Sequence, residues 1–76
     1  MKELIEHIAK SLASSPDEVK VALEEDEEGH VTIKLAVAED DKGKVIGRQG
    51  RVAQAMRVLL RVRAVKEDVR ASLEIV

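Results

Sequence analysis

The spacing of apolar residues changes along this chain between a helical and a strand period, and the order of those changes is the strongest constraint on its fold. Apolar residues three or four positions apart indicate a helix that buries one face, and strict alternation indicates a strand that does the same. The segments assigned in this way are a helix over residues 2–13, strands over 19–25 and 31–37, helices over 38–46 and 51–65, and a strand over 69–76. The order α-β-β-α-α-β, without repeat or linker, predicts one α+β domain over residues 1–76.

Each predicted strand has one buried face. The residues expected to point inward are Val19, Val21 and Leu23 in the first strand, Val31, Ile33, Leu35 and Val37 in the second, and Val69, Ala71, Leu73 and Ile75 in the third. The acidic stretch over residues 25–29 ends in glycine and predicts a hairpin loop. Ser15 precedes Pro16, which predicts that Ser15 caps one short extra turn after the first helix.

The chain contains no aromatic residue and no cysteine, and both absences exclude classes of function. Without Phe, Tyr or Trp it cannot stack bases on the aromatic platform of an RRM, so any base contact must use aliphatic side chains, backbone groups or arginine planes. Without cysteine it has no disulfide and no thiolate chemistry. No apolar run approaches the roughly 20 residues that cross a bilayer, and no signal segment follows the N-terminus. We therefore expect a cytoplasmic protein that does not insert into membranes.

The formal net charge of −2 conceals an asymmetry between the two halves of the chain. Residues 1–41 contain four lysines against twelve acidic residues, whereas residues 42–76 contain nine basic residues against three acidic ones. The second half is therefore a basic module on an acidic support, as expected for local contact with phosphate groups. A solvated surface with uneven charge would give the same numbers, so charge alone leaves nucleic-acid binding open.

Two glycines frame two polar residues between the two later helices, in the sequence Gly47-Arg48-Gln49-Gly50. Gly47 can adopt a positive φ as it ends the preceding helix, and Gly50 lets a ligand backbone approach closely. The loop leads into a helix N-terminus, where free N–H groups and the helix dipole attract a phosphate. The basic residues around this point are Lys42, Lys44, Arg48 and Arg51. A plain helix corner closed by glycine is the simpler alternative, and the basic cluster favours phosphate binding.

The segment Val45-Ile46-Gly47-Arg48-Gln49-Gly50-Arg51 resembles the V-I-G-x-x-G core of KH domains. The element order resembles the type II arrangement, in which an extra helix and strand precede the βααβ core. Over its whole length, including Lys2-Glu3-Leu4-Ile5 and Ala53-Gln54-Ala55-Met56-Arg57, the chain resembles the small bacterial single-KH proteins of the KhpA family. The resemblance implies a three-stranded mixed sheet with three helices packed on one face.

The same resemblance implies a cytoplasmic RNA-binding protein, an RNA chaperone or regulator that dimerises with itself or with the larger KH-containing partner KhpB. Members of the family are associated with RNA regulation and with cell elongation. The loop would hold the backbone of about four nucleotides of single-stranded RNA. Arg48 and Gln49 would contact phosphate directly, while Lys44 and Arg51 would supply longer-range attraction.

The bases would then lie over an aliphatic floor formed by Val45, Ile46 and Val52. Their outer edges would meet backbone groups of a strand, for which residues 31–37 are the expected choice. Core packing is an equally good interpretation of each of the three aliphatic residues, and both remain open.

The sequence gives little support to catalysis. The glycines of residues 43–50 are spaced G-x-x-x-G-x-x-G, which matches neither the dinucleotide fingerprint nor a P-loop. His7 and His30 are the only histidines, so a transition-metal site is not expected, and neither is a cofactor. The adjacent acids Asp40-Asp41 are interpreted as a helix start.

The helix predicted over residues 51–65 has more apolar surface than one sheet face can cover. The stripe assigned to the core consists of Ala53, Met56, Leu60 and Ala64, and a narrow polar stripe consists of Gln54, Arg57 and Arg61. Ala55, Leu59 and Val62 are left for a dimer interface, unless the first helix covers them. Two hypotheses follow: an RNA-binding module that works at the loop, and a protein-interaction subunit that works at the Leu59 face.

Overall fold

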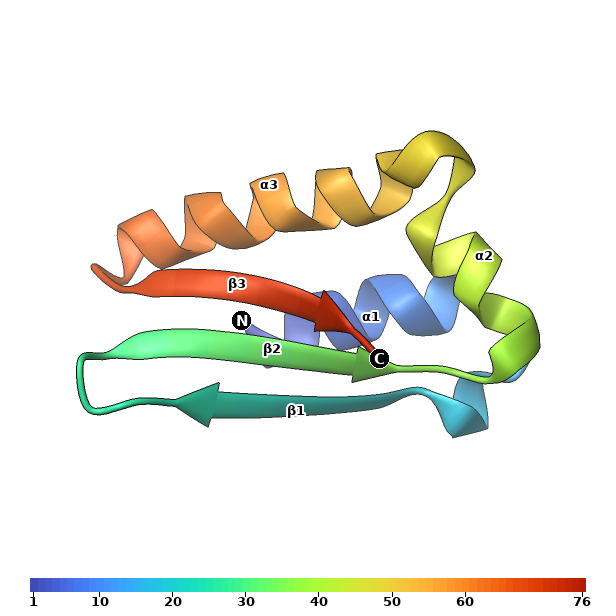
Figure 1. Cartoon of the computed structure of the whole chain (residues 1–76), viewed down its shortest axis with the longest axis horizontal. Helices are drawn as coiled ribbons and strands as arrows, with labels where there is room; N and C mark the ends of the chain where they lie inside the picture. Colours follow the sequence, from blue (N-terminus) through green and yellow to red (C-terminus); the bar gives the residue numbers. More distant parts are fainter.

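The structure is a computed structural model that describes residues 1–76 and contains the six segments in the predicted order (Figure 1). Helix α1 is Lys2–Leu12, strands β1 and β2 are Lys20–Glu25 and His30–Ala36, helices α2 and α3 are Lys42–Ile46 and Arg51–Lys66, and strand β3 is Arg70–Ile75. One-turn 3₁₀ helices lie in the connections, at Pro16–Glu18, Glu39–Asp41 and Arg48–Gly50. The predicted extra turn at Pro16 is confirmed, but the side chain of Ser15 makes no capping bond.

The three strands form one mixed sheet, as predicted, and their order in the sheet is β1-β2-β3. β1 and β2 are antiparallel and are joined by the acidic hairpin loop, in which the Asp26 carboxylate accepts the N–H groups of Glu28 and His30. β2 and β3 are parallel, so the chain must cross back to the other end of the sheet between them. The segment α2–loop–α3 makes this crossover and places the Gly47–Gly50 loop at one end of the molecule (Figure 1).

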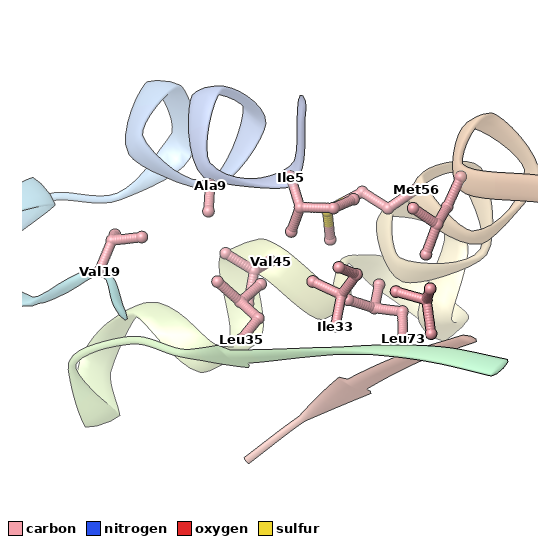
Figure 2. Packing of buried hydrophobic residues seen from close by; sticks show 10 residues of the cluster. Ile5, Ala9, Val19, Ile33, Leu35, Val45, Met56 and Leu73 are labelled. Atoms are coloured by element: carbon pink, nitrogen blue, oxygen red, sulfur yellow. The ribbon is translucent and has the colours of Figure 1, made fainter. Parts of the chain in front are cut away.

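All three helices pack on one face of the sheet. In Figure 2, side chains from each helix point toward the strands. The labelled residues are Ile5 and Ala9 of α1, Val45 of α2, Met56 of α3, Ile33, Leu35 and Leu73 of the sheet, and Val19, which precedes β1. Every apolar residue of this core is aliphatic or methionine, and each fully buried Ile or Leu contributes about 1.5–3 kcal/mol. The intervening strand residues lie on the opposite face, which no helix covers.

The burial predicted for β1 is only partly right. Val19 is buried and Val21 is half-buried, but Leu23 is 42% exposed. Leu23 pairs with Ile33, and directly paired residues project from the same face, so Leu23 does point to the helix side of the sheet. β1 is the edge strand farther from α3, and the helices leave its outer end uncovered. The alternating pattern identified the correct face but could not show how far the helices extend over it.

Candidate nucleic-acid interface

The chain reverses direction between α2 and α3 within the loop Gly47–Gly50. The N–H of Gly47 donates to the carbonyl of Gly43 at 2.9 Å and ends α2. Gly47 then adopts φ 79° and ψ 170°, Gln49 has φ 57°, and Gly50 has φ 74°. Three of the four loop residues therefore have positive φ, and the prediction for Gly47 is confirmed.

Glycine is required at position 47 for two separate reasons. Its combination of φ and ψ is essentially restricted to glycine. In addition, a Cβ at this position would lie 2.8 Å from the backbone nitrogen of Val52. At Gly50, by contrast, a Cβ would meet nothing within 4 Å. The loop therefore packs tightly against α3 at one glycine and leaves open space at the other.

Arg48 and Gln49 are exposed at the tip of the loop. The Arg51 guanidinium donates to the side-chain oxygen of Gln49 at 3.3 Å. No side chain caps the first turn of α3, a helix of 16 residues, so its leading N–H groups have no side-chain partner. Donors and positive charge thus converge on one exposed point, which suits an anion such as phosphate.

Lys44 lies beside the loop but is held by a carboxylate. Its Nζ is 3.5 Å from Oδ1 of Asp41 and also contacts the hydroxyl of Ser14. Asp41 is only 1% exposed and accepts the backbone N–H groups of Ser14 and Ser15, each at 3.0 Å. The bond from Ser14, followed by that from Ser15, lowers the pKa of Asp41, and burial opposes this effect. Asp41 therefore offsets part of the Lys44 charge, and the attraction of Lys44 for phosphate stays a prediction.

Asp41 is an important residue that the sequence interpretation missed. Its neighbour Asp40 is exposed, as expected of a helix start. Asp41, in contrast, is buried and binds Ser14 and Ser15, which lie 27 and 26 positions earlier in the chain. One signal could have distinguished the two acids. Asp41 lies four residues before Val45, and residues at that spacing share a helix face, so an inward Val45 implies an inward Asp41.

The predicted aliphatic floor is smaller than expected. Val45 has no exposed surface and is part of the core, so the core-packing alternative is correct for this residue. Ile46 is 39% exposed, and Val52 is half-buried. Ile46 precedes Gly47 in the chain and Val52 packs against it. An aliphatic surface available to a ligand therefore remains beside the loop, formed by Ile46 and Val52.

The choice of residues 31–37 as the strand that meets the bases is wrong. β2 is the central strand, and its backbone pairs with β1 on one side and with β3 on the other. The open edge beside α3 belongs to β3. Val76 donates its N–H to the carbonyl of Leu35 at 2.9 Å, and successive strand residues direct their backbone groups to opposite sides. The odd-numbered residues of β3 therefore present N–H and C=O groups that pair with no strand at this edge.

The two apolar stripes of α3 are divided as predicted. The buried residues are Ala53, Met56, Leu60 and Ala64. Ala55, Leu59 and Val62 are exposed, with 47% exposure at Leu59 and 52% at Val62, so α1 does not cover them. Val58 and Val65 are also exposed and share this side of the helix. We call these five residues the α3 outer face.

A βααβ unit with a Gly-x-x-Gly loop between its helices, preceded by one helix and one strand, defines a KH domain of the type II arrangement. A sequence profile described as the KH domain of KhpA and KhpB matches residues 2–75. The chain therefore belongs to the KhpA/KhpB KH-domain family.

Relatives in other bacteria match along the whole chain. The protein named RNA-binding protein KhpA in Clostridium acetobutylicum is 50% identical over 76 residues, which cover all of both chains. The protein of the same name in Caldanaerobacter subterraneus is 47% identical over 78 residues, again covering both chains completely. In Borreliella burgdorferi the identity is 48% over 73 residues, covering 96% of this chain and 88% of the relative.

Solved structures support the fold. Aquifex aeolicus Era bound to GDP and aluminium fluoride superposes with a TM-score of 0.62 at 18% identity. The match covers 97% of this chain and 28% of Era. A structure of Era with nucleotides of 16S ribosomal RNA gives the same TM-score. No helix of the present chain is both long and apolar enough to cross a membrane.

Proposed function

We propose that this protein is a single-KH RNA-binding protein of the cytoplasm, which grips single-stranded RNA with the Gly47–Gly50 loop and acts as an RNA chaperone or regulator. The observation that carries the proposal is the close seating of Gly47 against Val52, which holds Arg48 and Gln49 exposed at the start of α3. The name of the relatives, RNA-binding protein KhpA, supports the same function.

The geometry suggests how the grip would work. Phosphates would be held by Arg48, Gln49 and the first turn of α3, with Arg51 adding positive charge. The bases would turn toward Ile46 and Val52, and their edges toward the open edge of β3. A KH loop holds about four nucleotides in this manner. The grip involves no catalytic step and no cofactor.

Titration of labelled RNA tests the proposal. Fluorescence anisotropy should show that a single-stranded oligonucleotide binds more tightly than a duplex of the same sequence, because the bases must be unpaired to reach the β3 edge. One domain with few phosphate contacts should bind with a Kd on the order of micromolar and a shallow dependence on salt. Equal or tighter binding of the duplex would contradict this mode of recognition.

The α3 outer face favours a second candidate function. Leu59 and Val62 are about half exposed, and contiguous apolar surface of this kind usually marks a protein contact. We propose that this face joins two copies of the chain, or one copy and KhpB. In the stronger form of this alternative the protein is an interaction subunit that controls cell elongation, and RNA binding is secondary.

A further inference from the structure

A hollow of about 140 Å³ lies between α3 and the open edge of β3, outside the Gly47–Gly50 loop. Its lining consists of Arg57, Leu60 and Arg61 from α3, and of Ala71, Ser72 and Leu73 from β3. Sites for drug-sized ligands are larger, about 300–1,000 Å³, so this hollow suits one small flat group. The sequence interpretation placed Arg57 and Arg61 only in a polar stripe.

The two arginines of this hollow have no carboxylate partner. On the same helix, by contrast, the Arg63 Nε lies 3.1 Å from a Glu67 carboxylate oxygen. No acidic residue lines the hollow. Its guanidinium groups therefore offer hydrogen-bond donors and positive charge that nothing in this chain neutralises.

One hydrogen-bond acceptor faces the same space. The carbonyl of Leu73 points to the open edge of β3 and accepts a long bond of 3.5 Å from the Arg57 guanidinium. This contact holds Arg57 along the strand edge, yet its length leaves the guanidinium free to exchange partners. Leu60, Ala71 and Leu73 contribute the apolar part of the lining. The hollow thus combines an apolar surface, a guanidinium donor and a backbone acceptor within one small volume.

The hollow lies along the path of a bound strand. α3 begins beside the loop and runs alongside β3 (Figure 1). Arg57 is seven residues beyond Gly50, or about 10 Å along the helix axis at 1.5 Å per residue. RNA whose phosphates are held at the loop would carry its next bases along this groove.

We propose that the hollow receives one base of the bound RNA and selects guanine, an inference that rests on the proposed function. Arg57 donates two hydrogen bonds to O6 and N7 of guanine, the pair of acceptors that fits a guanidinium fork. The Leu73 carbonyl accepts the N1–H of the base, replacing its long bond to Arg57. Arg61 lays its planar group against the ring and so substitutes for the missing aromatic residue. Uracil lacks the adjacent acceptor pair and leaves donors unsatisfied.

Short RNAs that differ in one base, or in one ring atom of that base, test this pocket. The probes are hexauridylate and the same hexamer with one central guanosine or one central 7-deazaguanosine, which lacks N7. The wild type should bind the guanosine hexamer about tenfold more tightly than hexauridylate, within the range expected of one bidentate contact. The 7-deaza hexamer should lose most of that preference.

Two variants assign the preference to the hollow. Arg57→Lys keeps the charge but loses the planar pair of donors. The ratio of the affinity for the guanosine hexamer to that for hexauridylate should therefore fall to about one. Arg63→Lys makes the same chemical change on the same helix at a residue bound to Glu67, and the tenfold ratio should remain. Circular dichroism verifies that both variants are folded.

The outcomes separate this inference from the proposed function. If the wild type binds hexauridylate and the guanosine hexamer equally, the guanine pocket is wrong while single-strand binding stands. If Arg57→Lys keeps the full preference, guanine is read elsewhere and the assignment of the hollow is wrong. If neither single strand binds better than a duplex, the proposed function and the pocket fail together.

Discussion

The buried carboxylate of Asp41 accepts the backbone N–H of Ser14, just beyond the end of α1, at 3.0 Å. This bond joins the end of α1 to the start of α2, and α2 leads directly into the Gly47–Gly50 loop. A helix of five residues, such as α2, is not stable in isolation because helix nucleation is costly. The position of α2, and with it that of the loop, therefore depends on contacts such as those of Asp41.

Replacing Asp41 by Asn should lower the stability of the protein at neutral pH. The amide places a donor where one carboxylate oxygen accepts a backbone N–H, so one of the two bonds is lost. Urea unfolding followed by circular dichroism is the suitable measurement, because the chain has no aromatic fluorophore. The exposed neighbour provides a control, and Asp40→Asn should change stability by less than about 0.5 kcal/mol. Equal midpoints for the two variants would show that Asp41 does not connect the helices.

The same carboxylate should make stability depend on pH. The pKa of Asp41 in the folded protein is below its ordinary value of 3.8, so the unfolded chain takes up the proton at higher pH. Its stabilising contribution is complete above that ordinary value and is lost as the pH falls through the lower folded pKa. As the pH falls below 3.8, the wild type should therefore lose stability more steeply than Asp41→Asn. If stability falls with pH equally steeply in the wild type and in Asp41→Asn, the acid sensitivity belongs to other carboxylates.

Replacing each glycine of the loop region by alanine should change the stability of the fold by a different amount. Gly47→Ala combines a forbidden backbone conformation with a clash against Val52 and should cost about 3 kcal/mol or more. Gly50→Ala retains only the strain of positive φ, about 1–2 kcal/mol. Gly43→Ala, inside α2 with open space around it, should stabilise by up to about 1 kcal/mol. Thermal unfolding measures all three, and equal losses at Gly47 and Gly50 would contradict the close contact with Val52.

The order of helices and strands followed from periodicity because each element has a strong local pattern, whereas the mixed sheet with its helices on one face followed from the resemblance to KH domains. Alternation identified β2 and its buried residues Val31, Ile33 and Leu35, and helical spacing identified the buried stripe of α3. The interpretation of Leu23 failed because burial on an edge strand depends on how far a helix extends over it. Local sequence carries no such information.

The site was only partly predictable for a related reason. The conformation of Gly47 follows from its position at a helix end, and its role could be predicted. The burial of Asp41 and the open edge of β3 depend on contacts between distant parts of the chain. The parallel pairing of β2 with β3 decides which strand edge is open, and residues 31–37 looked suitable only while strand order was unknown.

Charge reversal at the loop tip should abolish RNA binding. The double substitution Arg48→Asp and Gln49→Asp places two negative charges where phosphate would bind and removes two donors. Both positions are exposed, so circular dichroism and the unfolding midpoint should change little. Lys66→Glu, at the far end of α3, provides a charge-reversal control that should weaken binding far less. Wild-type affinity in the double variant would remove the loop from the mechanism.

The α3 outer face should hold two copies of the chain together, and Leu59→Asp should separate them into folded monomers. Leu59 is 47% exposed while Met56 and Leu60 supply the core stripe, so a monomer loses little by the change. In a symmetric dimer, however, two aspartates would be buried close together, which is costly. Light scattering gives the mass, and circular dichroism reports whether the variant is folded.

A control and two contrary outcomes complete this test. Leu12→Asp alters an exposed leucine on α1 and should leave the mass unchanged. A wild type that is monomeric at high concentration would contradict the homodimer, and mixing with KhpB would then test whether the face serves a heterodimer. An unfolded Leu59→Asp variant would contradict the division of the two stripes, because it would mean that Leu59 contributes to the core although nearly half of its surface is exposed.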